Sequence, residues 1–206
     1  MRHLSGILRT RTAEAHHAAE AAMTLDFSRP DASEYLAVLN GMWIFHSSVA
    51  QFSRVTAARE FGSGTALLNR GQELRTDITL MSQRLTVPPD GFVRCDRGVG
   101  RQITTNQLSG GREERIGAAY VAAGSVLGGR VIAARLAASE CGDLPRSFFA
   151  SEGLDLGRLW RQFRIALDAF GESGADSARV IAGALAAFAL FGDILSCSTA
   201  ATSGST

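Results

Sequence analysis

The sequence contains no lysine, and all 21 of its basic residues are arginines, set against 20 acidic residues. The formal net charge of +1 gives no broad basic field of the kind on which nucleic-acid binding depends, so we expect no nucleic-acid partner. Cysteine is also scarce. Cys95, Cys141 and Cys197 form no Cys-x-x-Cys pair, which argues against a disulfide framework and against a thiolate zinc site.

Long hydrophobic runs are missing as well. The longest, from Val180 to Gly192, stops at Asp193 and is shorter than the roughly 20 apolar residues that a membrane-spanning helix needs. The amino-terminal residues contain no apolar core typical of a signal peptide. These absences predict a cytoplasmic protein without a membrane partner.

Helical periodicity is present along most of the chain. Apolar residues recur at steps of three and four, and Asp31 precedes Glu34 at the spacing of a capping box. No alternating strand pattern has turn residues at both ends, so the predicted fold class is all-α. We expect helices at about residues 5–23, 31–52, 67–81, 112–139, 159–170 and 181–195.

A composition with 46% hydrophobic and 20% charged residues indicates a globular domain. We expect one helical domain over residues 1–195, with ligand sites between facing helices, and a disordered tail over residues 196–206. Residues 88–107 show no clean periodicity and stay unassigned. The common phosphate-binding and hydrolase motifs are absent from the sequence.

The first predicted helix carries an unusual polar stripe. At about 100° per residue, Arg9, Thr12, His16 and Glu20 fall on one face. His16 could be a metal ligand oriented by Glu20, or it could be an ordinary surface histidine on an alanine-rich helix. The neighbouring His17 should point away from this face, towards solvent.

The fourth predicted helix contains a row of glycines. Gly117, Gly124 and Gly128 share one face, and each interior glycine destabilises a helix by around 1 kcal/mol relative to alanine. A flat ligand lying against the bare backbone would offset this cost. Close packing of another helix would explain the same spacing equally well.

These two segments together resemble the bacterial heme oxygenases, especially those that supply biliverdin to bacteriophytochromes. The resemblance extends over nearly the whole chain. The residues that carry it are Leu8, Arg9, Thr12, His16 and Glu20 in the first segment, and Tyr120, Val121, Gly124, Ser125, Leu127, Gly128 and Gly129 in the second.

The resemblance implies that heme lies between the first helix and the glycine-rich helix. His16 would be the axial iron ligand, and Glu20 would orient its imidazole. Gly124, Ser125 and Gly128 would form the distal, catalytic side. Tyr120 and Gly129 would contact heme, and Arg9, Arg161 and Arg164 would pair with its propionates.

Two positions depart from the family pattern. Ser125 stands where some members carry an aspartate that orders a water for proton delivery, so the resemblance implies that either Ser125 or a backbone-anchored water chain takes over this task. Ala123 stands where many bacterial members have glutamate. His46, in the second helix, is interpreted as a core or surface histidine without a role.

The implied activity is oxidative cleavage of heme to biliverdin, carbon monoxide and ferrous iron. Heme would be both substrate and prosthetic group, O2 the oxidant, and an external reductase or ferredoxin the source of electrons. A bacteriophytochrome is a candidate acceptor for biliverdin. The alternatives are a heme- or bilin-binding protein without turnover, and a non-heme relative of the same helical fold in which His16 is incidental.

Overall fold

The computed structural model of the chain describes residues 3–88 and 108–200. Within these residues every regular element is a helix, which confirms the all-α prediction. Most of residues 88–107, which the sequence analysis left unassigned, lie outside the described part. The elements are α1 (Leu4–Arg11), α2 (Ala13–Ala21), α3 (Ala32–Phe61), the 3-10 helix η1 (Gly62–Leu67), α4 (Gly71–Leu85), α5 (Arg112–Ala138), α6 (Ser147–Ala150), α7 (Leu156–Glu172) and α8 (Ser177–Ala200).

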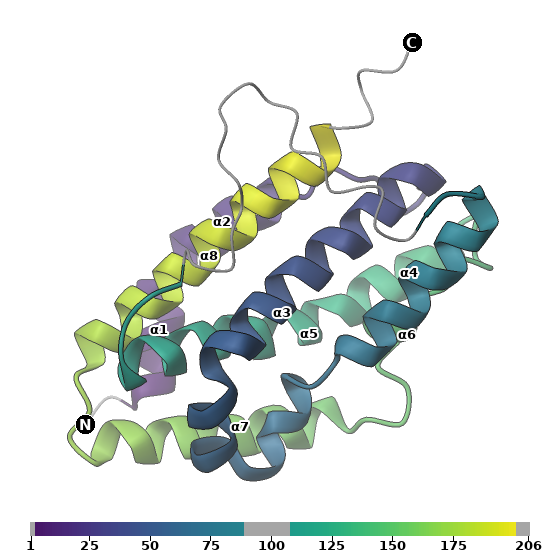
Figure 1. The fold of residues 1–206 in the computed structure, drawn as a ribbon. Helices are drawn as coiled ribbons and strands as arrows, with labels where there is room; N and C mark the ends of the chain where they lie inside the picture. The colour runs from purple at the N-terminus through teal and green to yellow at the C-terminus, as the bar shows by residue number, and fades with distance from the viewer. Residues whose placement is uncertain (1–2, 89–107, 201–206) are drawn as a thin grey trace.

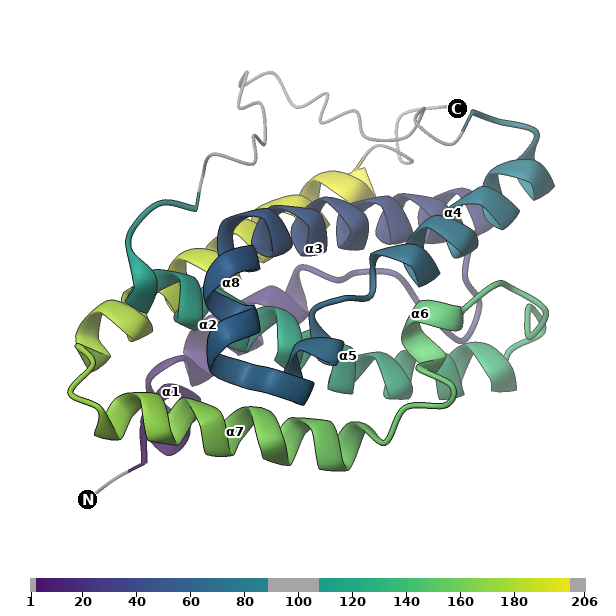
Figure 2. The ribbon, with the colours of Figure 1, turned by 60° about the horizontal axis from the view of Figure 1, so that its bottom comes forward.

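Three long helices form the centre of the molecule. α3, α5 and α8 all contact one another, and α2 lies along α8 (Figures 1 and 2). α7 crosses the end of this group and packs against η1 and α1. In this arrangement, one face of α2 and one face of α5 are directed towards each other across the bundle.

Local chemistry explains where the long helices begin. Asp31 caps α3, and its Oδ1 atom accepts hydrogen bonds from the backbone N–H groups of Ser33 and Glu34 at 2.8 and 3.0 Å. Asp155 caps α7 in the same way, accepting from the N–H of Arg158 at 2.9 Å. The start predicted from the Asp31 spacing is therefore confirmed.

The first predicted helix is in fact two helices. The backbone breaks at Thr12 (φ −109°, ψ 6°), whose hydroxyl donates to the carbonyl of Leu8 at 2.8 Å. Thr12 is buried whereas Arg9, His16 and Glu20 are exposed. The prediction of one polar stripe through all four residues was therefore wrong for Thr12.

Two further differences concern short or terminal segments. α6 was not predicted, because four residues are too few to show periodicity. α8 continues to Ala200, so the prediction of a disordered tail was wrong for residues 196–200. Residues 201–206 lie outside the described part.

Two helices meet the length and composition criteria for crossing a membrane, namely α5 and the Ser177–Ser196 part of α8. The longest uninterrupted apolar run in the sequence, Val180 to Gly192, was too short to indicate that these two helices meet the criteria. About half of each apolar window, 50% and 44%, is buried inside the fold. Packing of α5 against α8 thus accounts for the apolar composition of both, as it does in core helices generally.

Glycine brings α5 and α8 unusually close together. A Cβ atom on Gly117 would overlap the carbonyl oxygen of Val180 and lie 2.6 Å from the nitrogen of Ala184. A Cβ atom on Gly183 would overlap the carbonyl oxygen of Glu114. Close helix packing is therefore the correct interpretation for Gly117, one member of the predicted glycine row.

Candidate functional site

A cavity of about 710 Å³ lies between α2 and α5. α3, α7 and α8 contribute further residues to its wall, and most of the lining is apolar. This volume is within the range of pockets that hold small molecules and cofactors. Six of the predicted site residues line it: His16, Glu20, Tyr120, Gly124, Ser125 and Gly128.

His16 stands on the α2 side of the cavity. Its Nδ1 atom lies 3.4 Å from Oε2 of Glu20, one helical turn further on, and its ring packs edge-on against Phe188 at 5.6 Å. A carboxylate at Nδ1 favours the tautomer with its proton on that atom, so the lone pair of Nε2 is available to a metal. The His16 side chain is 54% exposed and lines the cavity.

His17 differs from His16 in its surroundings. Its side chain is 81% exposed, as predicted, and it does not belong to the cavity lining. Its Nδ1 atom nevertheless lies 3.5 Å from the same Glu20 oxygen. His17 is therefore a natural control for any test of His16.

The α5 side of the cavity is bare backbone. A Cβ atom on Gly124 or on Gly128 would meet no heavy atom within 4 Å, so both positions face open space. The interpretation that a ligand lies against the helix therefore fits these two glycines. Gly117 lies instead where α5 packs against α8. The three predicted glycines therefore serve two purposes: close helix packing at Gly117, and open space for a ligand at Gly124 and Gly128.

Gly129 does not line the cavity, although a direct ligand contact was predicted for it. It is buried against Phe149, and a Cβ atom there would lie 3.2 Å from Cδ1 and 3.3 Å from Cα of that residue. Phe149, from α6, does line the cavity. Gly129 thus lets α6 approach α5 and acts on the cavity only through the phenylalanine ring.

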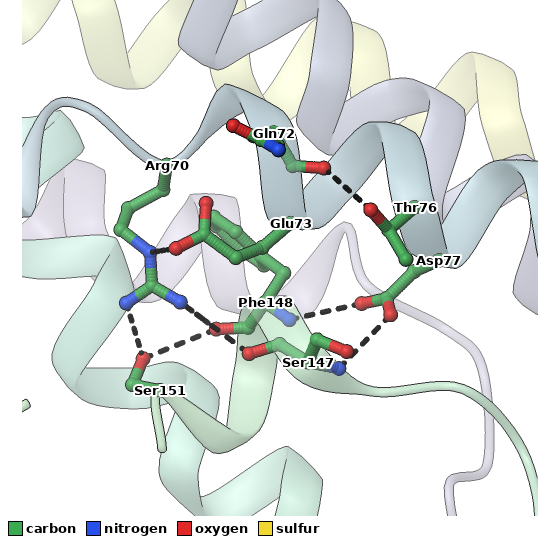
Figure 3. Close-up of polar contacts among 8 residues, drawn as sticks. All are labelled: Arg70, Gln72, Glu73, Thr76, Asp77, Ser147, Phe148 and Ser151. Carbon is green, nitrogen blue, oxygen red and sulfur yellow. Dashed lines mark hydrogen bonds and ion pairs between the residues drawn. The ribbon is translucent and has the colours of Figure 1, made fainter. Parts of the chain in front are cut away.

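Both ends of α6 are held by groups at or on α4 (Figure 3). The buried carboxylate of Asp77 accepts hydrogen bonds from the backbone N–H groups of Ser147 and Phe148 at 3.0 and 2.9 Å. The buried guanidinium of Arg70 donates to the carbonyls of Ser147 and Phe148 and to the hydroxyl of Ser151. Burial raises the pKa of Asp77, and the two N–H groups oppose that shift.

Ser125 connects the cavity to a buried histidine. Its Oγ atom donates to the carbonyl of Ala122 at 2.9 Å and lies 3.1 Å from Nε2 of His46. His46, on α3, is 3% exposed, and burial lowers its pKa to about 3. No role was predicted for His46, because nothing in the sequence links α3 to Ser125.

Tyr120 and Trp160 form another part of the lining, with ring centroids 5.7 Å apart. Burial raises the pKa of the Tyr120 phenol, and the positive charges of Arg9 and Arg164 oppose this. Arg9 and Arg164 are thus electrostatic neighbours of Tyr120. Both, together with Arg161, are exposed and lie outside the cavity lining.

Arg135 lines the cavity and was missed. It stands on α5 at helical spacing from Gly124 and Gly128, so the same face periodicity could have identified it. A guanidinium at this position could pair with a carboxylate group of a ligand in the cavity.

The comparisons agree with this architecture. The family model described as Heme oxygenase matches residues 2–196, nearly the whole chain. No curated protein matches this chain.

Proposed function

Since this chain belongs to the heme oxygenase family, whose members open the heme ring to biliverdin, we propose that its cavity holds heme between α2 and α5. One observation carries the proposal: a histidine with a free Nε2 stands across a cavity of about 710 Å³ from two glycines whose Cβ positions are empty. A flat ring requires a ligand on one side and close backbone on the other.

The residues present fit this group. His16 would bind the heme iron through Nε2, and Glu20 would fix the tautomer and orientation of its imidazole through Nδ1. Phe188 packs against the imidazole edge and restricts its rotation. The apolar lining around them excludes water from the face of the ring.

The distal side is formed by Gly124, Ser125 and Gly128. The glycines allow the α5 backbone to approach a bound ligand closely. Ser125, in the place of the aspartate of some family members, would offer its hydroxyl as a hydrogen-bond donor to a bound ligand or to a backbone-anchored water chain that carries protons to it.

The carboxylate arms of heme require cationic partners. The positive charges of Arg9 and Arg164 already oppose the upward shift in the pKa of Tyr120, and we propose that these two arginines pair with the propionates beside that residue. Arg161 would add to the positive potential there. Gly129 contributes indirectly by admitting Phe149 to the wall.

When bound, heme supplies both the iron that activates O2 and the ring that is cleaved. The protein holds that ring, keeps it dry and directs protons. We propose that electrons come from a separate reductase or ferredoxin, because the sequence shows neither a flavin motif nor the four cysteines of an iron–sulfur cluster. We further propose a cytoplasmic location and a bacteriophytochrome as acceptor of biliverdin, on the basis of the sequence resemblance.

A heme or bilin carrier of the same fold is the second candidate, favoured by Ser125 at a position that is acidic in some members. One absorption time course separates the two functions. Protein is mixed with one equivalent of hemin, then given ascorbate or a reductase system in air, with catalase present to remove free peroxide. Decay of the Soret band to a biliverdin spectrum supports turnover, and a stable heme spectrum supports a carrier. Absence of heme binding contradicts the oxygenase and a heme carrier, and leaves only a bilin carrier, which added biliverdin would then test.

A further inference from the structure

His46 lies directly behind the cavity wall. It is buried on α3, and its Nε2 atom is 3.1 Å from the hydroxyl oxygen of Ser125, which lines the cavity. The sequence predicted no role for this histidine. Its contact with Ser125 still determines which hydrogen bonds the serine is able to make.

The direction of the hydrogen bond follows from the partners of both groups. Ser125 has one hydroxyl proton, and its oxygen donates to Ala122 at 2.9 Å, so the same oxygen accepts from Nε2–H of His46. Among the described residues, Nδ1 of His46 has no hydrogen-bond partner. An N–H at Nδ1 would be a buried donor without an acceptor, which is less favourable than an unpaired lone pair there.

The imidazole is held in this orientation from two sides. The ring of Phe45 meets it edge-on at 5.5 Å, and the ring of Phe148 does so at 5.0 Å. Phe148 belongs to α6, whose ends are fixed by Asp77 and Arg70 (Figure 3). The α4–α6 contact therefore fixes one of the two rings that hold the His46 imidazole.

We infer that His46 is a positioning residue for Ser125: its Nε2–H occupies the accepting side of the serine oxygen, so the serine hydroxyl acts towards the cavity only as a donor. The hydroxyl proton points to the Ala122 carbonyl in the ligand-free protein and turns to a ligand that offers a better acceptor. This inference rests on the proposed function, because it assigns the ligand's acceptor atom to the distal side of heme.

A purely structural role for His46 predicts different behaviour. If the ring only filled space, its tautomer would be independent of Ser125, and an apolar replacement of similar size would leave the donor strength of Ser125 unchanged. The two accounts are separated by measuring the tautomer and the donor strength directly.

The first measurement uses the ligand-free protein and NMR of its imidazole nitrogens. The inference predicts a neutral His46 with its proton on Nε2, and a changed Nε2 resonance in Ser125→Ala. A proton on Nδ1, or a resonance unaffected by Ser125→Ala, overturns it. This NMR measurement does not require hemin. If hemin fails to bind, the proposed function fails, but the NMR result still decides the geometry of His46.

The second measurement is the affinity of the hemin-loaded protein for fluoride at fixed pH. Bound fluoride accepts hydrogen bonds from nearby donors, so its affinity reports the donor strength of Ser125. Ser125→Ala and His46→Leu should each weaken fluoride binding about tenfold, the effect of one lost hydrogen bond, and the double variant no further. His46→Gln, which keeps an N–H donor near the ε position, should remain within about threefold of the unmodified protein.

Ser53→Ala is the matched control, since Ser53 is also a buried serine but donates to the carbonyl of Arg115 instead. It should leave fluoride binding unchanged. If His46→Leu does not fold, His46→Asn replaces it, because its shorter side chain does not reach Ser125. Normal fluoride binding in the His46 variant, or additive losses in the double variant, overturns the inference.

Discussion

Gly117 on α5 lies so close to Val180 on α8 that a side chain at Gly117 would overlap the Val180 carbonyl oxygen. Seven residues further along α5, Gly124 faces empty space. We predict that Gly117→Ala destabilises the fold by about 1–3 kcal/mol, because backbone atoms must shift. Gly124→Ala should be neutral or stabilising by up to about 1 kcal/mol, because alanine is the better helix former. Urea unfolding of the ligand-free variants checks both, and equal effects would contradict the assignment of the two glycines.

Gly124 is also predicted to control access to the distal side. Gly124→Leu should keep the spectrum of histidine-ligated heme, since the change is on the side opposite His16, but should slow ring opening at least about tenfold. The measurement is the rate of Soret decay under reducing conditions in air. Gly6→Leu is the control, because Gly6 is an exposed helical position on α1 with open space around it. Unchanged turnover in Gly124→Leu would show that the distal side lies elsewhere.

Asp77 is predicted to be essential for the position of α6. An amide in its place can accept only one of the two N–H bonds from Ser147 and Phe148 and turns an N–H group towards the other. Asp77→Asn should therefore lower the free energy of unfolding by about 1–3 kcal/mol. Asp143→Asn is the control, since Asp143 pairs with Arg84 at the exposed surface, where solvent screens the attraction and the pair contributes little to stability. Comparable losses in the two variants would contradict the role of Asp77.

Acid should destabilise the protein through His46. Burial lowers its pKa in the folded state to about 3, whereas the unfolded chain takes up a proton near pH 6.5. The contribution of His46 to stability is therefore complete above about pH 6.5 and is lost as the pH falls towards 3. Relative to His46→Gln, the unmodified protein should lose about 2 kcal/mol of stability between pH 7 and pH 5. Urea unfolding at the two pH values checks this, and parallel losses would mean that His46 is not held neutral.

Periodicity predicted the long helices well, because apolar residues recur at helical spacing in each, although residues 35–42 of α3 are buried on every side. It could not find the break at Thr12, where the backbone dihedral angles leave the helical range although the N–H of Thr12 still donates to the carbonyl of Leu8. Nor could it find α6, whose position depends on Asp77 and Arg70, some 70–80 residues earlier in the chain.

The cavity was predictable where one helix supplies several residues at regular spacing. His16 with Glu20, and Gly124 with Gly128, are such pairs. Spacing could not separate Gly117 from Gly124, because the difference lies in what α8 covers. The contact between His46 and Ser125 joins two helices and depends on tertiary packing alone.

The central claim is that His16 ligates heme between α2 and α5. The most direct test is a hemin titration of the unmodified protein, His16→Ala and His17→Ala, followed by absorption spectroscopy and with circular dichroism as a check of folding. We predict that His16→Ala folds but loses the spectrum of histidine-ligated heme, that added imidazole restores it, and that His17→Ala is unaffected. An unchanged spectrum in His16→Ala would contradict the account.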